Sequence, residues 1–393
     1  MTPLQRTQIG IVGAGPAGLL LAHLLHLQGI DSVILEARSR DYVENRIRAG
    51  VLEHGTAELL AQSGVGERMR RIGLPHEGTN LRFAGRDHRI DFQALTGRAV
   101  TVYSQHEIVR DLIEARLAAD APILFECDRV SVHDLDTDRP SIRYHFQGEE
   151  RRLACDFVAG CDGFHGVCRP SIPDGVLSVF ERSYPFGWLG ILADTAPSSH
   201  ELVYAGHERG FALLSMRSPT VSRLYLQCAP DEDAEAWSDD RIWAELGTRL
   251  TAEGFNLRQG RITQKSVTPM RSFLVEPMQY GRLFLLGDAA HIVPPTGAKG
   301  LNLAVADVAV MSRALGAFYR DRDTALLEDY SETCLRRVWQ VQRFSWWMTS
   351  LLHRFESHTP FERRVQRAER DHIASSVAAS TALAENYVGW PLP

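Results

Sequence analysis

The chain has 393 residues, 44% of them hydrophobic, and a formal net charge of −6. This length allows two or three domains with substantial cores, and the mild acidity gives no basic patch of the kind that binds nucleic acid. Six cysteines occur without a CxxC pair, so no zinc or other metal site is expected and a reducing, cytoplasmic setting is favoured.

The first predicted elements form a strand, a turn, a helix and a second strand. Residues 8–12 are typical of a buried strand, GAGPAG follows at 13–18, a helix ends near Gly29, and residues 32–36 form the next strand. This order predicts a βαβ unit of a parallel sheet. The apolar stretch 9–25 also suggests a signal or membrane segment, but it is short, rich in glycine and lacks a basic leader, so no membrane association is expected.

Gly13, Gly15 and Gly18 fit the GxGxxG pattern in its expected position between strand and helix. Glycines there permit a tight turn and close approach of a pyrophosphate to the helix N-terminus. Glu36 ends the second strand, where an acid binds a ribose hydroxyl. The pattern therefore predicts dinucleotide binding, and the alternative is a structural turn with Glu36 solvated.

The middle of the chain changes to short β-rich runs over residues 180–230. Their spacing predicts a mainly antiparallel sheet, with a hairpin about residues 218–220. Alternation places Ser215 and Arg217 on one face of their strand, and Arg223 and Tyr225 on one face of the next. From about Leu301 the pattern is helical. We divide the chain into residues 1–179, 180–290 and 291–393.

Two further turns follow apolar strands. Asp162 and Gly163 come after residues 157–160, and GDAAHIVPPTGAKGLN at 287–302 comes after residues 283–286. The second stretch contains Lys299, one of only two lysines in the chain. Taken alone, each turn is as well explained by an ordinary connection.

The three turns in this order resemble those of the single-component FAD-dependent aromatic hydroxylases. Further stretches resemble the members of that family that act on 4-hydroxybenzoate: NRIRAGVLE at 45–53, HEG at 76–78, CDGFHG, YPFGWLG, RFSWWMTS and ENYVG. The resemblance implies an α/β fold: a Rossmann-like FAD-binding domain with a parallel sheet over 1–179, a β-rich substrate domain over 180–290, and a flavin-contacting loop with a helical interface region over 291–393. It also implies a homodimer.

The resemblance implies which residues contact FAD. Asp288 would bind the ribityl chain, the helix N-terminus near Gly300 would face the flavin pyrimidine edge, and Lys299 would add positive potential. The full implied set is Gly13, Gly15, Gly18, Glu36, Arg46, Arg48, Gln105, Asp162, Arg223, Asp288, Lys299, Gly300, Leu301 and Asn302.

The resemblance assigns the nicotinamide cofactor to Arg38, Arg40, Tyr42, Arg48 and Arg223. NADPH-preferring relatives carry Arg-Gln after the acid of the second strand, whereas this chain has Ala37 to Arg40. Arg38 and Arg40 could hold a 2′-phosphate or form a solvated helix face, so NADPH and NADH both remain possible donors.

The substrate residues implied are Ser215, Arg217 and Tyr225 for the carboxylate, and the Pro295 carbonyl for the hydroxyl. Tyr204, Tyr387 and His76 would relay the phenolic proton, although any one tyrosine or histidine is more often structural. The expected reaction converts 4-hydroxybenzoate to 3,4-dihydroxybenzoate with NAD(P)H and dioxygen, through a flavin hydroperoxide. Two alternatives remain: a relative acting on another hydroxy- or amino-benzoate, and a non-catalytic flavin-binding sensor.

Overall fold

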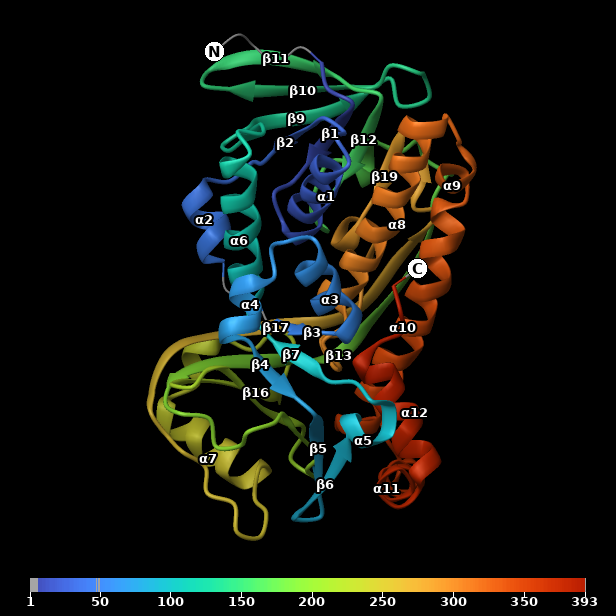
Figure 1. Ribbon diagram of the computed structural model, residues 1–393. Coiled ribbons are helices and arrows are strands. Elements are labelled where there is room, and N and C mark those ends of the chain that lie inside the picture. The colour runs from blue at the N-terminus through green and yellow to red at the C-terminus, as the bar shows by residue number, and fades with distance from the viewer. Residues whose placement is uncertain (1–5, 47, 49, 393) are drawn as a thin grey trace.

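The computed structural model describes residues 6–46, 48 and 50–392 (Figure 1). Ile47 and Ala49 of the NRIRAGVLE stretch lie outside these residues. One half of the molecule is built on a six-stranded sheet with β1 near its centre. Its strands, in spatial order, are β18 (Gln279–Tyr280), β19 (Leu283–Leu285), β12 (Phe157–Gly160), β1 (Ile9–Val12), β2 (Ser32–Leu35) and β8 (Ile123–Leu124).

All pairs in this sheet are parallel except β18 with β19. The predicted βαβ unit is confirmed: β1, helix α1 (Pro16–Leu27) and β2 follow in that order. Strands buried on both faces need continuous apolar sequence, and β1 and β2 are buried at every position. A three-stranded sheet covers one end, with β11 (Glu149–Ala154), β10 (Ser141–Phe146) and β9 (Asp128–His133).

The other half is built on an eight-stranded sheet, mainly antiparallel as predicted. Its strands, in spatial order, are β20 (His291–Ile292), β17 (Arg261–Glu276), β13 (Ser178–Asp194), β16 (Val221–Cys228), β15 (Ala212–Ser218), β14 (Val203–Ala205), β5 (Gly78–Phe83) and β6 (Arg86–Asp91). The predicted hairpin joins β15 to β16, because Ser218 pairs with Val221. One pair, β14 with β5, is parallel.

Sheet membership does not follow the linear division at residues 179 and 290. Strands β5 and β6 come from the first segment but complete the eight-stranded sheet, whereas β18 and β19 come from the second segment and extend the six-stranded one. A small sheet of β3 (Val51–Leu52), β7 (Val100–Val102) and β4 (Leu74–His76) lies between the halves (Figure 1). The two halves are therefore interwoven along the chain.

Helices pack on both sheets and link them. Helix α8 packs on α1, and α10 contacts α8, β17 and α11, so α10 extends along both halves (Figure 1). The region predicted to be helical from about Leu301 contains several helices, and the last two are separate because Ser376 accepts a hydrogen bond from Ala379 N–H and begins a new helix. The remaining helices are α2 (Arg40–Asn45), α3 (His54–Gln62), α4 (Glu67–Ile72), α5 (Phe92–Thr96), α6 (Gln105–Ala118), α7 (Asp239–Arg249), α8 (Gly300–Asp321), α9 (Ala325–Glu328), α10 (Tyr330–Leu352), α11 (Pro360–Ser375) and α12 (Val377–Val388).

One described helix, α8, is long and apolar enough to cross a membrane by composition alone, but 78% of its apolar window is buried inside the protein. Its apolar residues pack against α1 and α10. The stretch 9–25 likewise forms β1 and most of α1, within the largest core cluster.

Candidate active site

The glycine-rich turn after β1 has the shape that a pyrophosphate requires. A Cβ on Gly13 would lie 2.4 Å from the Cys161 carbonyl oxygen, and one on Gly18 would lie 2.0 Å from the Gly13 carbonyl oxygen. A Cβ on Gly15, in contrast, would meet no atom within 4 Å. No side chain caps α1, so the N-terminal amides of α1 face open space, where an anion is favoured.

Glu36 holds this turn in place. One carboxylate oxygen accepts from the backbone N–H of Ala14 at 2.7 Å, and the other accepts from Arg38 N–H at 2.8 Å. Each oxygen keeps a second lone pair, so the carboxylate can still accept from a ribose hydroxyl. The predicted cofactor acid is therefore also the residue that organises the loop.

The two later turns meet the first one at the carboxyl end of the parallel sheet, because β12 lies between β1 and β19. Asp162 Oδ2 accepts from Cys168 N–H at 2.8 Å, whereas its buried Oδ1 has no partner among the described residues. Burial raises the pKa of Asp162. Asp288 is exposed although residues 283–287 and 289–291 are buried. Both carboxylates can therefore bind polar groups of FAD.

The loop before α8 places backbone amides at the same edge. No side chain caps α8, so the N–H groups of its first turn, at Gly300, Leu301 and Asn302, point away from the helix. The Asn302 side chain is already used: Oδ1 accepts from Glu53 N–H at 2.9 Å, and Nδ2 donates to Val51 at 3.0 Å. The backbone of Asn302, more than its side chain, is available to the flavin.

Lys299 is 1% exposed and does not present a free ammonium. Its Nζ donates to Glu53 Oε1 at 2.7 Å and to the Tyr387 carbonyl at 2.9 Å, while Arg337 approaches the other Glu53 oxygen at 3.3 Å. Burial lowers the pKa of Lys299, and Glu53 opposes that shift. The positive potential expected from Lys299 is thus largely balanced by Glu53, a partner the sequence did not suggest.

The expected substrate residues share one face of the eight-stranded sheet. Tyr204 pairs with Leu213, Leu213 with Tyr225, and Tyr225 with Gly190, so these four residues form a row across four strands. Directly paired residues point to the same face, and Ser215 and Arg217 follow Leu213 at intervals of two. The predicted alternation holds as far as Ser215, which pairs with Arg223. The register shifts between Met216 and Ser218, so Arg217 lies at an irregularity of β15, where burial and then the charge of the nearby Arg223 lower its pKa. The strand pairing adds Tyr204 to the face.

Arg217 is the residue of this face whose side chain has unused hydrogen-bond donors. Nη1 donates to Ser104 Oγ at 3.0 Å, but Nε and Nη2 are buried without a partner among the described residues. Arg223 lies across the strand from Ser215, and its Nε is also buried without a partner. Burial, and then the charge of Arg223, lower the pKa of Arg217 to about 10. Two guanidinium groups with unused donors require an anion.

Tyr204 and Tyr387 form the first link of the expected relay, with their hydroxyl oxygens 2.7 Å apart. Burial raises the pKa of Tyr204 to about 12, although Tyr387 and the Gly297 N–H oppose the shift. His76 is 1% exposed, both ring nitrogens lack a partner among the described residues, and burial lowers its pKa to about 4. The structure has no direct hydrogen bond between Tyr387 and His76.

Comparison with known proteins decides the family. The FAD binding domain family matches residues 6–345. The p-hydroxybenzoate hydroxylase of Acinetobacter baylyi is 50% identical over 98% of this chain and 96% of its own length. A 3-(3-hydroxy-phenyl)propionate/3-hydroxycinnamic acid hydroxylase of Mycobacterium avium is 27% identical over 82% of this chain and 57% of its own length. The chain belongs to the FAD-dependent aromatic hydroxylases.

The fold of this hydroxylase is shared with solved structures. A p-nitrophenol 4-monooxygenase from Pseudomonas putida superposes with a TM-score of 0.81, covering 98% of this chain and 99% of the other at 20% identity. The match to the FAD binding domain family makes FAD the cofactor, and the open Gly15 cradle and the outward Asp288 fit it.

Two further expected cofactor residues lie apart in the chain, Gln105 on α6 and Arg48 in the connection between α2 and β3. Gln105 begins α6, beside Ser104. Arg48 is exposed. Partial desolvation of its guanidinium and then the charge of Arg46 lower the pKa of Arg48, whereas the charge of Asp288 raises it.

Of the expected nicotinamide residues, Arg38, Arg40 and Tyr42 lie in or beside α2, whereas Arg223 lies on β16. The guanidinium groups of Arg38 and of the neighbouring Arg46 lie 5.4 and 5.9 Å from the Tyr42 ring centroid. Arg40 pairs with Glu44 at 2.5 Å.

Pro295 is exposed in the flavin-contacting loop. Its carbonyl accepts from Ala298 N–H at 3.0 Å. That bond fixes the direction of the carbonyl, and the second lone pair remains for a substrate hydroxyl.

Sequence reasoning missed a buried pair that supports the GD turn. Asp307 Oδ2 accepts from Gly287 N–H at 2.9 Å and contacts His291 Nε2 at 2.7 Å. Burial opposes the charge on His291, but Asp307 outweighs it and raises the pKa of His291. The signal was a single acid within the apolar run LNLAVADVAV, because a buried charge needs a partner.

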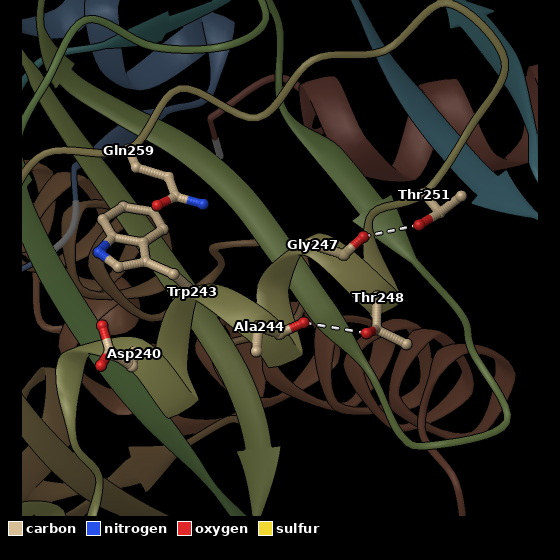
Figure 2. Close-up of a pocket in the computed structure, with 7 residues that line it drawn as sticks. All are labelled: Asp240, Trp243, Ala244, Gly247, Thr248, Thr251 and Gln259. Atoms are coloured by element: carbon tan, nitrogen blue, oxygen red, sulfur yellow. Dashed lines mark hydrogen bonds between the residues drawn. The ribbon is translucent and has the colours of Figure 1, made fainter.

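A surface hollow along α7 contains none of the expected site residues (Figure 2). The hydroxyls of Thr248, within α7, and Thr251, just after it, donate to the α7 carbonyls of Ala244 and Gly247. The polar side chains of Asp240 and Gln259 there are exposed to solvent, and the hollow has no buried charge that needs a ligand, so it does not compete with the sheet face as a candidate site.

Proposed function

We propose that the protein hydroxylates 4-hydroxybenzoate at the ring carbon beside the phenol oxygen, giving 3,4-dihydroxybenzoate. NADPH or NADH supplies two electrons, and dioxygen supplies one atom to the ring and one to water. The observation that carries this proposal is a single sheet face with unused Arg217 donors near one end and the Tyr204–Tyr387 hydroxyl pair near the other. A ligand with a carboxylate and a phenol at opposite ends matches both.

The residues of the chain bind and orient this substrate. The planar Arg217 guanidinium donates to the carboxylate, and Ser215 and Tyr225 add hydroxyl donors on the same face. FAD, when bound, supplies the redox and oxygen chemistry. The protein holds the ring against it and excludes water from the buried face.

The phenolic proton leaves through the tyrosine pair. A phenolate ring is more electron-rich than a phenol ring, so removing the proton activates the ring toward an electrophilic oxygen. Tyr204 accepts the proton, Tyr387 passes it on, and His76 receives it through intervening water, because its neutral ring can accept.

We further propose that Arg38 and Arg46, on either side of Tyr42, bind the nicotinamide nucleotide, because Arg40 already has Glu44 as a partner.

We propose a cytoplasmic homodimer. All six cysteines are free and buried, which fits a reducing compartment, and the exposed apolar residues Phe180, Trp339 and Trp346 would be covered by a second copy.

The test is anaerobic reduction of the holoenzyme flavin by NADPH or NADH, with and without 4-hydroxybenzoate. We expect 4-hydroxybenzoate to accelerate reduction, and 3,4-dihydroxybenzoate to form once air is admitted. The nucleotide that reduces faster identifies the donor. Acceleration by another hydroxy- or amino-benzoate alone would reassign the substrate, and absence of reduction by both nucleotides would favour a non-catalytic flavin-binding sensor.

A further inference from the structure

His353 lies at the end of α10 and is completely buried. Its Nε2 lies 2.7 Å from Trp188 Nε1, and its Nδ1 lies 3.0 Å from the Thr349 carbonyl oxygen. An indole N–H can only donate, so Nε2 must accept, and the ring proton must be on Nδ1. The two neighbours therefore fix one neutral tautomer, and burial lowers the pKa of His353 to about 3, which keeps it neutral.

The imidazole ring is also fixed in orientation by aromatic stacking. Its centroid is 4.6 Å from that of Phe186, with 4° between the planes, and 4.4 Å from that of Phe211, with 28° between them. Both nitrogens of His353 are hydrogen-bonded, and Phe186 and Phe211 stack on its ring. The imidazole therefore has a single orientation available.

The partners of His353 reach both ends of the substrate face. Trp188 packs on Tyr225 with 4.8 Å between ring centroids, and Phe211 packs toward Tyr204 with 6.2 Å between them. Trp188 also stacks on Phe211 at 5.1 Å. Tyr225 belongs to the proposed carboxylate end and Tyr204 to the phenol end. His353 therefore contacts the two residues, Trp188 and Phe211, that pack against these tyrosines.

The same residue is connected to the flavin-contacting loop. Thr349, whose carbonyl contacts His353 Nδ1, has its hydroxyl 3.0 Å from that of Thr296 in the GDAAHIVPPTGAKGLN stretch, and both threonines are buried. A chain of contacts thus runs from Thr296 through Thr349, His353 and Trp188 to Tyr225. It joins the loop that would hold the flavin to the sheet that would hold the substrate.

We propose that His353 is a positioning residue that sets the substrate ring relative to the flavin, by fixing Trp188 and Phe211 against the sheet and tying them to the flavin-contacting loop. This inference rests on the proposed hydroxylation of 4-hydroxybenzoate. Small errors in the relative position of two reacting groups cost large factors in rate. Loss of His353 should therefore waste reducing equivalents, which a purely structural role would not do.

The test compares two substitutions in the FAD-loaded enzyme. His353→Phe keeps an aromatic ring in the stack but leaves the Trp188 N–H without an acceptor. His353→Gln loses the ring but offers an amide oxygen to Trp188. Tyr319→Phe serves as the matched control, because it removes one partly buried hydrogen bond, to Asp156 at 2.9 Å, near the C-terminal end of α8.

Three quantities are measured: the Kd of 4-hydroxybenzoate from the flavin absorbance change, the 3,4-dihydroxybenzoate formed per NAD(P)H oxidised, and Tm. For His353→Phe we expect a Kd about tenfold higher, because Trp188 no longer holds Tyr225 in its binding position, with product yield falling and peroxide taking its place. His353→Gln should recover most of the yield. Tyr319→Phe should lower Tm without changing Kd or yield.

If His353→Phe lowers Tm like the control while Kd and product yield stay at wild-type values, His353 is only a core residue and the inference is wrong. If His353→Gln forms as little 3,4-dihydroxybenzoate per NAD(P)H oxidised as His353→Phe, the hydrogen bond to Trp188 does not position the substrate ring, and the inference is also wrong. If the wild-type enzyme itself forms no 3,4-dihydroxybenzoate, the proposed function fails first, and that result is distinguishable from either of these.

Discussion

Two clusters of buried charge lie near the flavin-contacting loop, and they differ in how they are neutralised. Lys299, Glu53 and Arg337 form one cluster, in which every charge faces an opposite charge within 3.3 Å. Arg217 and Arg223 form the other, and among the described residues neither has a carboxylate partner. The first cluster is complete in the ligand-free protein, whereas the second is complete only when an anion binds.

This difference separates a structural use of charge from a functional one. Breaking a buried pair is expensive because it leaves the partner charge uncompensated. A buried charge without a partner already carries that cost in the ligand-free state and recovers it on binding. Substitutions in the two clusters should therefore shift stability in opposite directions.

The largest effect is expected for Arg217→Leu. Removing a desolvated guanidinium that pairs with the substrate carboxylate should cost about 2–5 kcal/mol of binding, which lowers kcat/KM for 4-hydroxybenzoate by about 30- to 5,000-fold. The same substitution should leave the ligand-free holoenzyme as stable as the wild type or more so. Steady-state kinetics and urea unfolding measure the two quantities.

Arg217→Lys is the matched control, because it keeps the charge but loses the planar pair of donors. We expect it to lie between the wild type and Arg217→Leu in kcat/KM. A clear loss of ligand-free stability in Arg217→Leu would show that Arg217 supports the fold, and the distinction between the two clusters would then collapse.

Lys299→Met should lower the stability of the ligand-free holoenzyme, in contrast to Arg217→Leu. It leaves Glu53 buried with only Arg337 nearby, so we expect a loss of about 3 kcal/mol in the free energy of unfolding. The only other lysine, Lys265, pairs with the exposed Glu235 at 3.3 Å, and Lys265→Met should cost less than about 1 kcal/mol. Equal losses for the two lysines, in urea unfolding of the holoenzymes, would contradict the assignment.

The two clusters also mark what the sequence could predict. Ser215 and Arg217 were placed on one face by period-two alternation, which is a local property of a strand. The βαβ unit and its glycine-rich turn were local in the same sense. The Lys299–Glu53 pair joins residues 246 positions apart, and only tertiary packing brings them together. A lone buried lysine required some acid, but the sequence could not say which one.

Strand register could not be predicted from the sequence either. The row from Tyr204 to Gly190 depends on three separate strand pairings, and the sequence had placed Tyr204 near the substrate only through family resemblance. The parallel contact of β14 with β5 brings residues 78–83 into a sheet that otherwise begins a hundred residues later. Long-range pairing of this kind leaves no periodic signal in either strand.

Tyr387→Phe tests whether the uncharged end of the substrate face works as a relay. The substitution removes the hydroxyl that bonds Tyr204 but leaves the Arg217 cluster intact. We expect hydroxylation to slow by about 100-fold, in the range typical of lost proton transfer, while the Kd of 4-hydroxybenzoate changes less than about threefold because the carboxylate contacts remain.

The absorbance of the bound substrate provides the second readout for Tyr387→Phe, since phenol and phenolate differ in the ultraviolet. The pH at which bound 4-hydroxybenzoate ionises should rise in the variant. Tyr330→Phe, which removes a buried hydroxyl bonded to the Leu285 carbonyl at 2.9 Å, controls for loss of a buried hydrogen bond elsewhere. An unchanged ionisation in Tyr387→Phe would remove the tyrosine pair from the proton path.

The smallest expected effect concerns His76, which the fold holds neutral. Burial lowers its pKa to about 4, below the ordinary value of 6.5. A depressed pKa means that the unfolded chain takes up the proton first, so the stability that His76 contributes is present above pH 6.5 and is lost as pH falls toward 4. Between pH 7 and pH 5.5 this loss amounts to about 1 kcal/mol.

His76→Leu should therefore flatten the pH dependence of unfolding by about that amount, because leucine takes up no proton in either state. His353 and His106 shift in the same direction, so the informative quantity is the difference in slope between variant and wild type, measured by urea unfolding from pH 5.5 to 7. Parallel curves would mean that His76 already takes up a proton in the folded enzyme near neutral pH. In that case a charged His76 would end the relay, and the proton could not be received there.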